Sequence, residues 1–186
     1  MEPGEHARLK EYLEALDESE IHSLLVEYFV YRRTQADIVH STGEHGMDVV
    51  AYVDWTQDFL RKGYNVIIQA KPGGLSLDEW RREVLFQLLE LPYYRIPHHN
   101  YQEHLPRRVV LVALGDITLE ARNSIKEFNK KHDVTIEALG LEDLIRLFDL
   151  TGFATSKLLQ ITGIGQPEAE QISAEVPSPP PPEVGG

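Results

Sequence analysis

The stretch from residue 43 to residue 74 most constrains what this chain can fold into, because it predicts a β-hairpin that the rest of the chain must support. Residues 47–53 alternate in polarity and are rich in Val and Tyr, and residues 65–71 form a short apolar run that ends at Pro72-Gly73-Gly74. Residues 54–64 are too many for a tight turn, so we expect a partly helical connection between the two strands.

Polar residues interrupt both predicted strands. Asp48 stands near the start of the first strand, and Gln69 and Lys71 end the second. Because side chains alternate between the two faces of a strand, Gln69 and Lys71 point to one face while Ile68 and Ala70 point to the other. A carboxylate on one strand can therefore lie beside an amide and an ammonium group on its neighbour. Such groups are costly to place near a core, so they mark a candidate functional site.

The composition narrows the class of protein. With 186 residues, 42% hydrophobic and 26% charged, the chain suits one globular domain with a substantial core. It has no cysteine, which excludes disulfides, cysteine zinc sites and cysteine nucleophiles. The longest aliphatic run, residues 109–114, is too short to span a membrane, and the N-terminus has no apolar signal region, so we expect a soluble cytoplasmic protein without a membrane partner.

The order of predicted elements indicates an α/β fold. The sequence predicts helices at 5–16 and 20–33, three strands ending at Lys71, and then alternating helices and strands at 77–91, 108–114, 119–131, 134–138 and 141–149. Ser76 and Glu79 form a capping box at the start of the helix at 77–91. This order predicts a mixed sheet with helices on both faces. We interpret residues 93–106, with His98, His99 and His104, as an irregular surface loop, and the acidic, proline-rich residues 166–186 as a disordered tail.

Asp48 followed by Gln69-x-Lys71, and then by helix, strand, helix, strand and helix, resembles the PD-(D/E)XK nuclease superfamily. The glutamine and the segment GEHGMDVV at 43–50 are similar to its Mrr-like restriction endonuclease branch. The resemblance covers about residues 21–148. It implies a restriction-endonuclease-like mixed central sheet flanked by helices, and a metal-dependent DNA endonuclease related to restriction or defence. The domain prediction is an N-terminal helix (1–20), the nuclease domain (21–152), a short helical extension (153–165) and the tail (166–186).

The resemblance also implies the roles of site residues. Asp48, the Gln69 amide oxygen and the Ala70 carbonyl would hold Mg²⁺ or Mn²⁺, and Lys71 would orient the attacking water or stabilise the phosphorus centre. These proteins often carry a glutamate on the helix before the first strand. His22 stands at that place. Either Glu20 is the auxiliary acid after a small shift, or the site binds one metal weakly.

The net charge of −12 argues against a generic basic nucleic-acid binder, so contact with DNA must come from local clusters. Arg81 and Arg82, one helical turn after the motif, are the candidate phosphate contacts. Cutting both strands of a duplex with one small site calls for two copies, which predicts a homodimer.

Two alternatives stay open. The trio of Asp48, Gln69 and Lys71 can be a structural ion pair with a hydrogen-bonding amide. The chain can also be a catalytically silent nuclease-fold module for nucleic-acid recognition or assembly, because a glutamine in place of the usual acid removes one negative charge from the ligand set.

Overall fold

The computed structural model describes residues 1–39, 48–57, 60–90, 107–132 and 135–163. Its centre is a five-stranded sheet in the order β1-β2-β3-β4-β5. The strands are β1 (Gln35–Ile38), β2 (Val49–Gln57), β3 (Leu60–Lys71), β4 (Arg107–Ala113) and β5 (Ile136–Leu139). β1, β2 and β3 pair antiparallel, whereas β3, β4 and β5 pair parallel. The mixed sheet predicted from the sequence is therefore confirmed.

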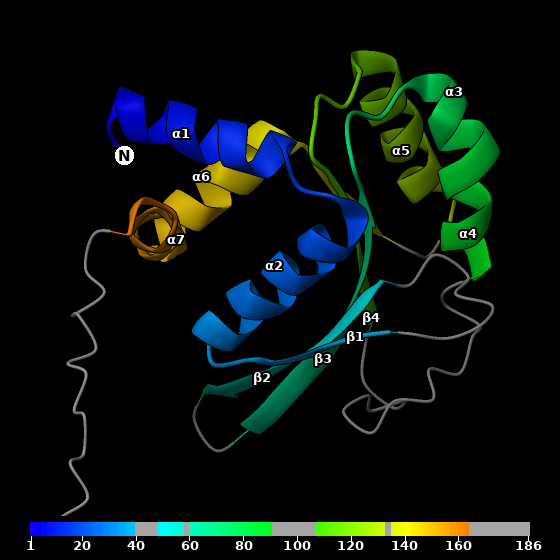
Figure 1. Ribbon diagram of the computed structural model, residues 1–186. Coiled ribbons are helices and arrows are strands. Elements are labelled where there is room, and N and C mark those ends of the chain that lie inside the picture. Colours follow the sequence, from blue (N-terminus) through cyan, green and yellow to red (C-terminus); the bar gives the residue numbers. More distant parts are fainter. Residues whose placement is uncertain (40–47, 58–59, 91–106, 133–134, 164–186) are drawn as a thin grey trace, which may run out of the picture.

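Helices cover both faces of this sheet (Figure 1). One face carries α1 (Pro3–Glu14), α2 (Glu18–Tyr31), α6 (Leu141–Thr151) and α7 (Phe153–Thr162). The other face carries α3 (Leu77–Glu79), the π-helical turn η1 (Trp80–Val84), α4 (Leu85–Glu90) and α5 (Leu119–Lys131). The three segments α3, η1 and α4 follow one another without a break. The predicted α/β class with helices on both faces is confirmed.

The alternation of side chains along β3 separates two hydrophobic cores. Ile68 and Ala70 belong to the core beneath α2, α6 and α7. Ile67 belongs to the core beneath η1, α4 and α5, whose largest buried side chain is Trp80. Gln69 and Lys71 follow the periodicity of Ile67, so they extend from β3 toward the helix formed by α3, η1 and α4.

The connection between β2 and β3 differs from the expectation of a partly helical segment at 54–64, which is wrong. β2 continues to Gln57 and β3 begins at Leu60, with backbone pairs as far as Gln57 opposite Leu60. The added residues include Trp55, Thr56 and Tyr64, which are types that favour strands, and pairing satisfies the backbone groups that a loop would leave to solvent. The hairpin is therefore longer than its apolar segments suggested.

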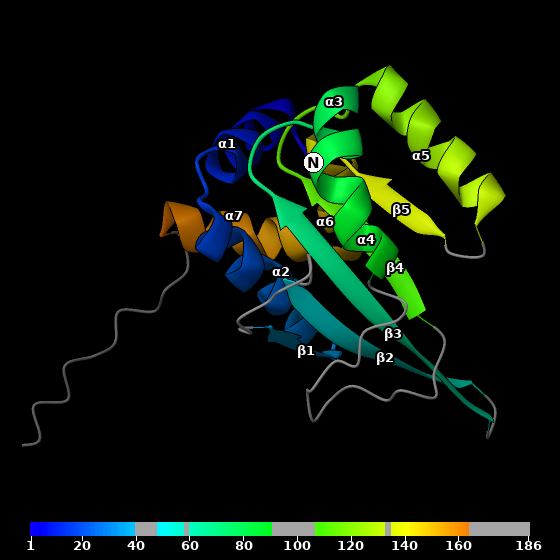
Figure 2. The same cartoon turned by 90° about the vertical axis from the view of Figure 1, so that its right-hand side faces the viewer.

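The turn after β3 fixes where the next helix begins. Gly73 has a φ of 77°, a left-handed conformation that favours glycine. Gly74 lies against the turn after β4, where a Cβ atom would lie 2.7 Å from the carbonyl oxygen of Asp116. Leu75 then donates its N–H to the same oxygen at 3.0 Å. This close backbone contact places α3 directly beyond the end of β3 (Figure 2).

Two helix starts are capped by the reciprocal bonds that the sequence pattern favours. Ser76 accepts the N–H of Glu79 and donates its own N–H to the Glu79 carboxylate, which confirms the predicted capping box of α3. Asp17 and Glu20 form the same arrangement at the start of α2. The starts of α2 and α3 are thus both held by reciprocal capping bonds.

Several predictions concern residues outside those that the structure describes. They are the motif residues 43–47, the loop at 93–106 with its three histidines, and the tail at 166–186. Among the helices of the described residues, none has the length and apolar character needed to cross a membrane.

Candidate active site

Asp48 immediately precedes β2 and is only 9% exposed. Its N–H donates to the carbonyl oxygen of Ile68 at 2.9 Å, and its Oδ2 accepts the N–H of Ala70 at 2.6 Å. The carboxylate therefore lies against the backbone of β3, at the point where Gln69, Ala70 and Lys71 follow one another. Within the described part of the chain, the hydrogen bond from Ala70 and the contact with His22 both go to Oδ2.

Gln69 is also 9% exposed, and its two amide atoms have different surroundings. Nε2 donates to Oε1 of Gln87 on α4. Oε1 is buried and has no hydrogen-bond partner among the described residues. A buried acceptor without a donor destabilises the fold by roughly 1–3 kcal/mol, so this oxygen has the environment expected of a cation ligand. The donor set of Asp48, Gln69 and Ala70, all oxygens, fits a hard divalent cation.

Lys71 pairs with two carboxylates of the facing helix. Its Nζ lies 3.1 Å from Oε2 of Glu83 and 3.3 Å from Oε1 of Glu79. Burial lowers the pKa of Lys71, but the hydrogen bonds and charges of Glu83 and Glu79 more than offset burial and raise this pKa above its usual value. The pKa of Glu79 is lowered, first by the backbone N–H and hydroxyl of Ser76 and then by Lys71. The ammonium group is therefore held charged at the end of β3.

These contacts show which predicted residues the structure brings together. Asp48 reaches the Gln69–Ala70–Lys71 segment through the Ala70 N–H, so the acid and the motif on the neighbouring strand are adjacent. The ammonium group of Lys71 pairs with Glu79 and Glu83, whereas the Asp48 carboxylate lies 3.7 Å from the His22 imidazole. These contacts therefore do not form the buried Asp48–Lys71 ion pair that the sequence left open.

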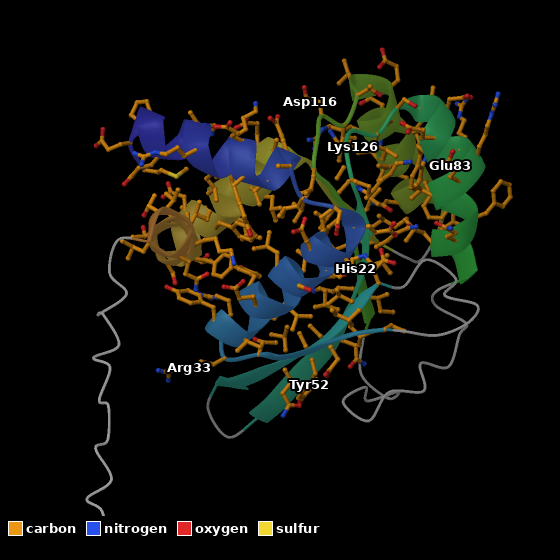
Figure 3. All side chains as sticks on the ribbon, viewed as in Figure 1. His22, Arg33, Tyr52, Glu83, Asp116 and Lys126 are labelled. Atoms are coloured by element: carbon orange, nitrogen blue, oxygen red, sulfur yellow. The ribbon has the colours of Figure 1, made fainter. Side chains whose placement is uncertain are left out.

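His22 and Glu18 approach Asp48 from α2. Nε2 of His22 lies 3.7 Å from Oδ2 of Asp48, and ligand atoms of Glu18, His22 and Asp48 all lie within 4.8 Å of one another. In Figure 3 His22 lies where α2 meets the sheet, and Glu83 lies on the helix of the opposite face. The sequence pattern predicted His22 at the position of the helix acid but did not indicate Glu18. The i, i+4 spacing of the two residues on one helix was the signal available.

Glu20, the acid predicted for this role, has a different position. Its carboxylate accepts the N–H of Asp17 at 2.9 Å as part of the helix cap. Glu20 therefore serves the start of α2, while Glu18 is the acid of this helix turn beside Asp48. The difference follows from the helical period, because residues two apart lie on different sides of a helix.

Arg81 and Arg82 lie exposed on η1, on the helix whose other residues pair with Lys71. Nε of Arg82 lies 3.3 Å from Oδ1 of Asp78, an exposed i, i+4 pair. Such surface pairs contribute little to stability, so the guanidinium group remains available to a stronger anion. The predicted phosphate contacts are thus placed on the solvent side of the helix that faces the motif.

No family model matches the sequence, and no curated protein matches it. Among solved structures, the DNA modification-dependent restriction endonuclease AspBHI is similar with a TM-score of 0.51 and 12% identity, over 88% of this chain and 41% of AspBHI. MspJI restriction endonuclease in complex with a 27-mer oligonucleotide has a TM-score of 0.48 and 14% identity, over 88% of this chain and 36% of MspJI. Restriction endonuclease FokI bound to DNA has a TM-score of 0.48 and 13% identity, over 88% of this chain and 29% of FokI. This chain therefore spans less than half the length of each of these proteins. The likeness to AspBHI shows a restriction-endonuclease-like fold.

Proposed function

We propose that this chain is a metal-dependent endonuclease of the Mrr-like PD-(D/E)XK branch, which hydrolyses phosphodiester bonds of DNA in a restriction or defence role. The observation that carries the proposal is the buried Gln69 Oε1, which has no hydrogen-bond partner among the described residues and lies on the strand against which Asp48 rests. One fold hosts many functions, so the support for this activity comes from the site residues and not from the fold alone.

Asp48, Gln69 and Ala70 are the proposed ligands for Mg²⁺ or Mn²⁺. When bound there, the cation would lower the pKa of an attacking water and stabilise the negative charge that develops on the phosphate. The Ala70 N–H fixes the orientation of the Asp48 carboxylate, and the Gln87 side chain fixes that of the Gln69 amide. These two hydrogen bonds would reduce the freedom that the Asp48 and Gln69 side chains lose when a cation binds, which would lower the cost of binding.

Lys71 is the proposed catalytic cation. Glu79 and Glu83 keep its side chain protonated and hold it at the end of β3, so we assign them a positioning role. A preorganised ammonium group in a partly buried site can orient the water and stabilise charge in the transition state. Arg81 and Arg82 would contact the backbone of the DNA, and a second copy of the chain would supply the cut in the other strand.

The decisive experiment compares plasmid cleavage by the parent protein with that by Asp48→Asn and Lys71→Met, in Mg²⁺ or Mn²⁺ and with EDTA. Asparagine at 48 can still accept the Ala70 N–H, whereas alanine would leave that buried donor unpaired. Each variant should lose at least about a hundredfold in rate, the usual effect of removing one preorganised electrostatic contact. Lys126→Met, on the exposed side of α5, is the matched control and should cut at the parent rate. Parent-level cleavage by both site variants would assign the activity to a contaminant or to another site.

A catalytically silent module for nucleic-acid recognition or assembly is the second candidate. Two observations favour it: Gln69 lacks the charge of an acid, and Lys71 is already paired with Glu79 and Glu83. This module would shift DNA in a gel assay and leave it intact with every divalent ion tested. Metal-dependent nicking that Lys71→Met abolishes would exclude this candidate.

A further inference from the structure

The proposed function uses Asp48, but it leaves unexplained the two side chains of α2 beside that carboxylate. We propose that Glu18 and His22 complete a mixed nitrogen and oxygen metal site with Asp48, and that His22 makes this site select first-row transition ions such as Mn²⁺ and Co²⁺ over Mg²⁺. The inference rests on the proposed function only in taking Asp48 as a metal ligand.

The spacing of the three side chains suits ligands of one ion. The distance of 3.7 Å between Nε2 of His22 and Oδ2 of Asp48 is too long for a hydrogen bond. Two ligands that each lie about 2.1 Å from a shared ion are themselves roughly 3–4 Å apart. The ligand atoms of Glu18, His22 and Asp48 all lie within 4.8 Å of one another, so a small side-chain adjustment would bring the three to one ion.

The surrounding structure holds these ligands in place. Glu18 is in the first turn of α2 and His22 follows one turn later, and the Asp17 capping box fixes that end of the helix. Ile21, next to His22, is fully buried in the core that joins α2 to the sheet. Asp48 is held from the sheet side by the Ala70 N–H. Two of the ligands thus come from one anchored helix and the third from the strand against which that helix packs.

Two of the three side chains are shielded from solvent, and the third is accessible to an ion from solution. The side chains of His22 and Asp48 are 14% and 11% exposed, whereas Glu18 is exposed to solvent. Two carboxylates and a neutral imidazole would together carry two negative charges, which matches a divalent cation. An ion can enter from the side of Glu18 and then lose water to the two shielded ligands.

The imidazole determines the selectivity. Mg²⁺ prefers oxygen ligands and gives up its water reluctantly, whereas imidazole nitrogen suits transition ions. Affinity for a site of nitrogen and oxygen ligands rises from Mn²⁺ to Co²⁺. A glutamate at position 22 would leave only oxygen ligands, so the residue at this position would decide which class of cation binds.

The test is isothermal titration of the full, untagged chain with Mg²⁺, Mn²⁺ and Co²⁺. The parent should bind Co²⁺ at least about tenfold more tightly than Mg²⁺. His22→Ala should weaken Co²⁺ binding by about tenfold or more while changing Mg²⁺ binding by less than about threefold, and His22→Glu should reverse the preference toward Mg²⁺. Bound Co²⁺ should give a visible absorption spectrum that changes in both His22 variants.

Glu18 provides a second variant whose folding is not at risk, because its side chain is exposed. Glu18→Gln should weaken binding of all three ions, whereas Glu120→Gln, an acid in the first turn of α5, should not. Equal loss of every ion in His22→Ala, or parent-like Co²⁺ binding in both His22→Ala and Glu18→Gln, would overturn the inference. The titration does not depend on cleavage, so the two proposals can fail separately. A protein that binds Co²⁺ through His22 but does not cut DNA would contradict the proposed function alone. Mg²⁺-dependent cleavage without a role for His22 would contradict this inference alone.

Discussion

At the scale of single residues, Gln69 provides the main support for the proposed metal site. Its amide group is held by Gln87 on one side, while its buried oxygen has no donor among the described residues. A neutral amide can occupy this position without a cation at modest cost. An acid at the same position would be a buried charge and would need a compensating ion.

Gln69→Glu therefore has opposite consequences with and without a bound metal. Without metal it should lower the free energy of unfolding by on the order of 1–3 kcal/mol, because the new carboxylate is buried and uncompensated. With Mg²⁺ or Mn²⁺ it should bind the ion more tightly than the parent, because the number of charged ligands sets the affinity of hard-cation sites. Thermal melting of parent and variant across a metal titration measures both effects.

The pH dependence of Gln69→Glu has a defined sign. Burial would raise the folded-state pKa of the new carboxyl above its unfolded value of about 4.3. The penalty is then absent below about pH 4.3 and grows as the pH rises above this value. Gln35→Glu, which adds the same charge at an exposed position of β1, is the control and should show neither effect. A destabilised Gln69→Glu that metal does not rescue would favour the silent module.

At the scale of elements, the continuous helix of α3, η1 and α4 presents three residues to the end of β3. Glu79, Glu83 and Gln87 are four residues apart, and they contact Lys71 or Gln69. The middle part of this helix is π-helical, a conformation that is often found at functional sites. Ser76 caps the start of this helix and also lowers the pKa of Glu79, so the cap and the ionisation of Glu79 are linked.

Ser76→Ala should lower the free energy of unfolding by about 1 kcal/mol through loss of the helix cap. It should also raise the pKa of Glu79, because the Ser76 hydroxyl contributes to lowering that pKa. A carboxyl with a lowered folded-state pKa stabilises the fold above its unfolded value of 4.5, and this contribution is lost as the pH falls. The deficit of the variant should therefore shrink in acid, as urea unfolding at several pH values would show.

Thr118→Ala is the matched control for this cap. Thr118 accepts the N–H of Ala121 at the start of α5. Ala121 occupies the position that Glu79 has in α3, and its side chain does not titrate. Loss of the Thr118 cap should cost a similar free energy of unfolding at every pH. A pH-independent deficit in Ser76→Ala as well would show that Glu79 is not coupled to its cap.

At the scale of the whole molecule, helices from both ends of the described chain complete one core. Leu9 and Leu13 of α1, and Phe153 and Leu158 of α7, are buried in the cluster that also contains Ile68 of β3. The segments that the sequence set apart as an N-terminal helix and a helical extension therefore pack on the sheet face that carries α2. Loss of either one would expose the core that anchors Glu18 and His22.

Truncation after Gly152 should lower the free energy of unfolding by at least about 3 kcal/mol, because Phe153 and Leu158 would no longer be buried and each contributes roughly 1.5–3 kcal/mol. Truncation after Gly165 is the control. Residues 166–186 are polar and rich in proline, so the melting temperature should change by no more than about 1–2 °C. Equal melting temperatures for the two truncations would show that α7 does not support the core.

The sequence by itself determined the features that depend on local periodicity and short-range bonds. The opposite faces of Ile68 and Gln69, the Ser76 cap and the α/β order all follow from alternation along a strand, from capping chemistry and from the spacing of apolar residues. The tertiary structure decided the partners of the site residues. Glu18 rather than Glu20 lies beside Asp48 because of how α2 is rotated on its face of the sheet, and Lys71 pairs with Glu83 because η1 packs on the other face. Such contacts join residues far apart in the chain, and they depend on the position and rotation of each docked helix, which no local pattern specifies.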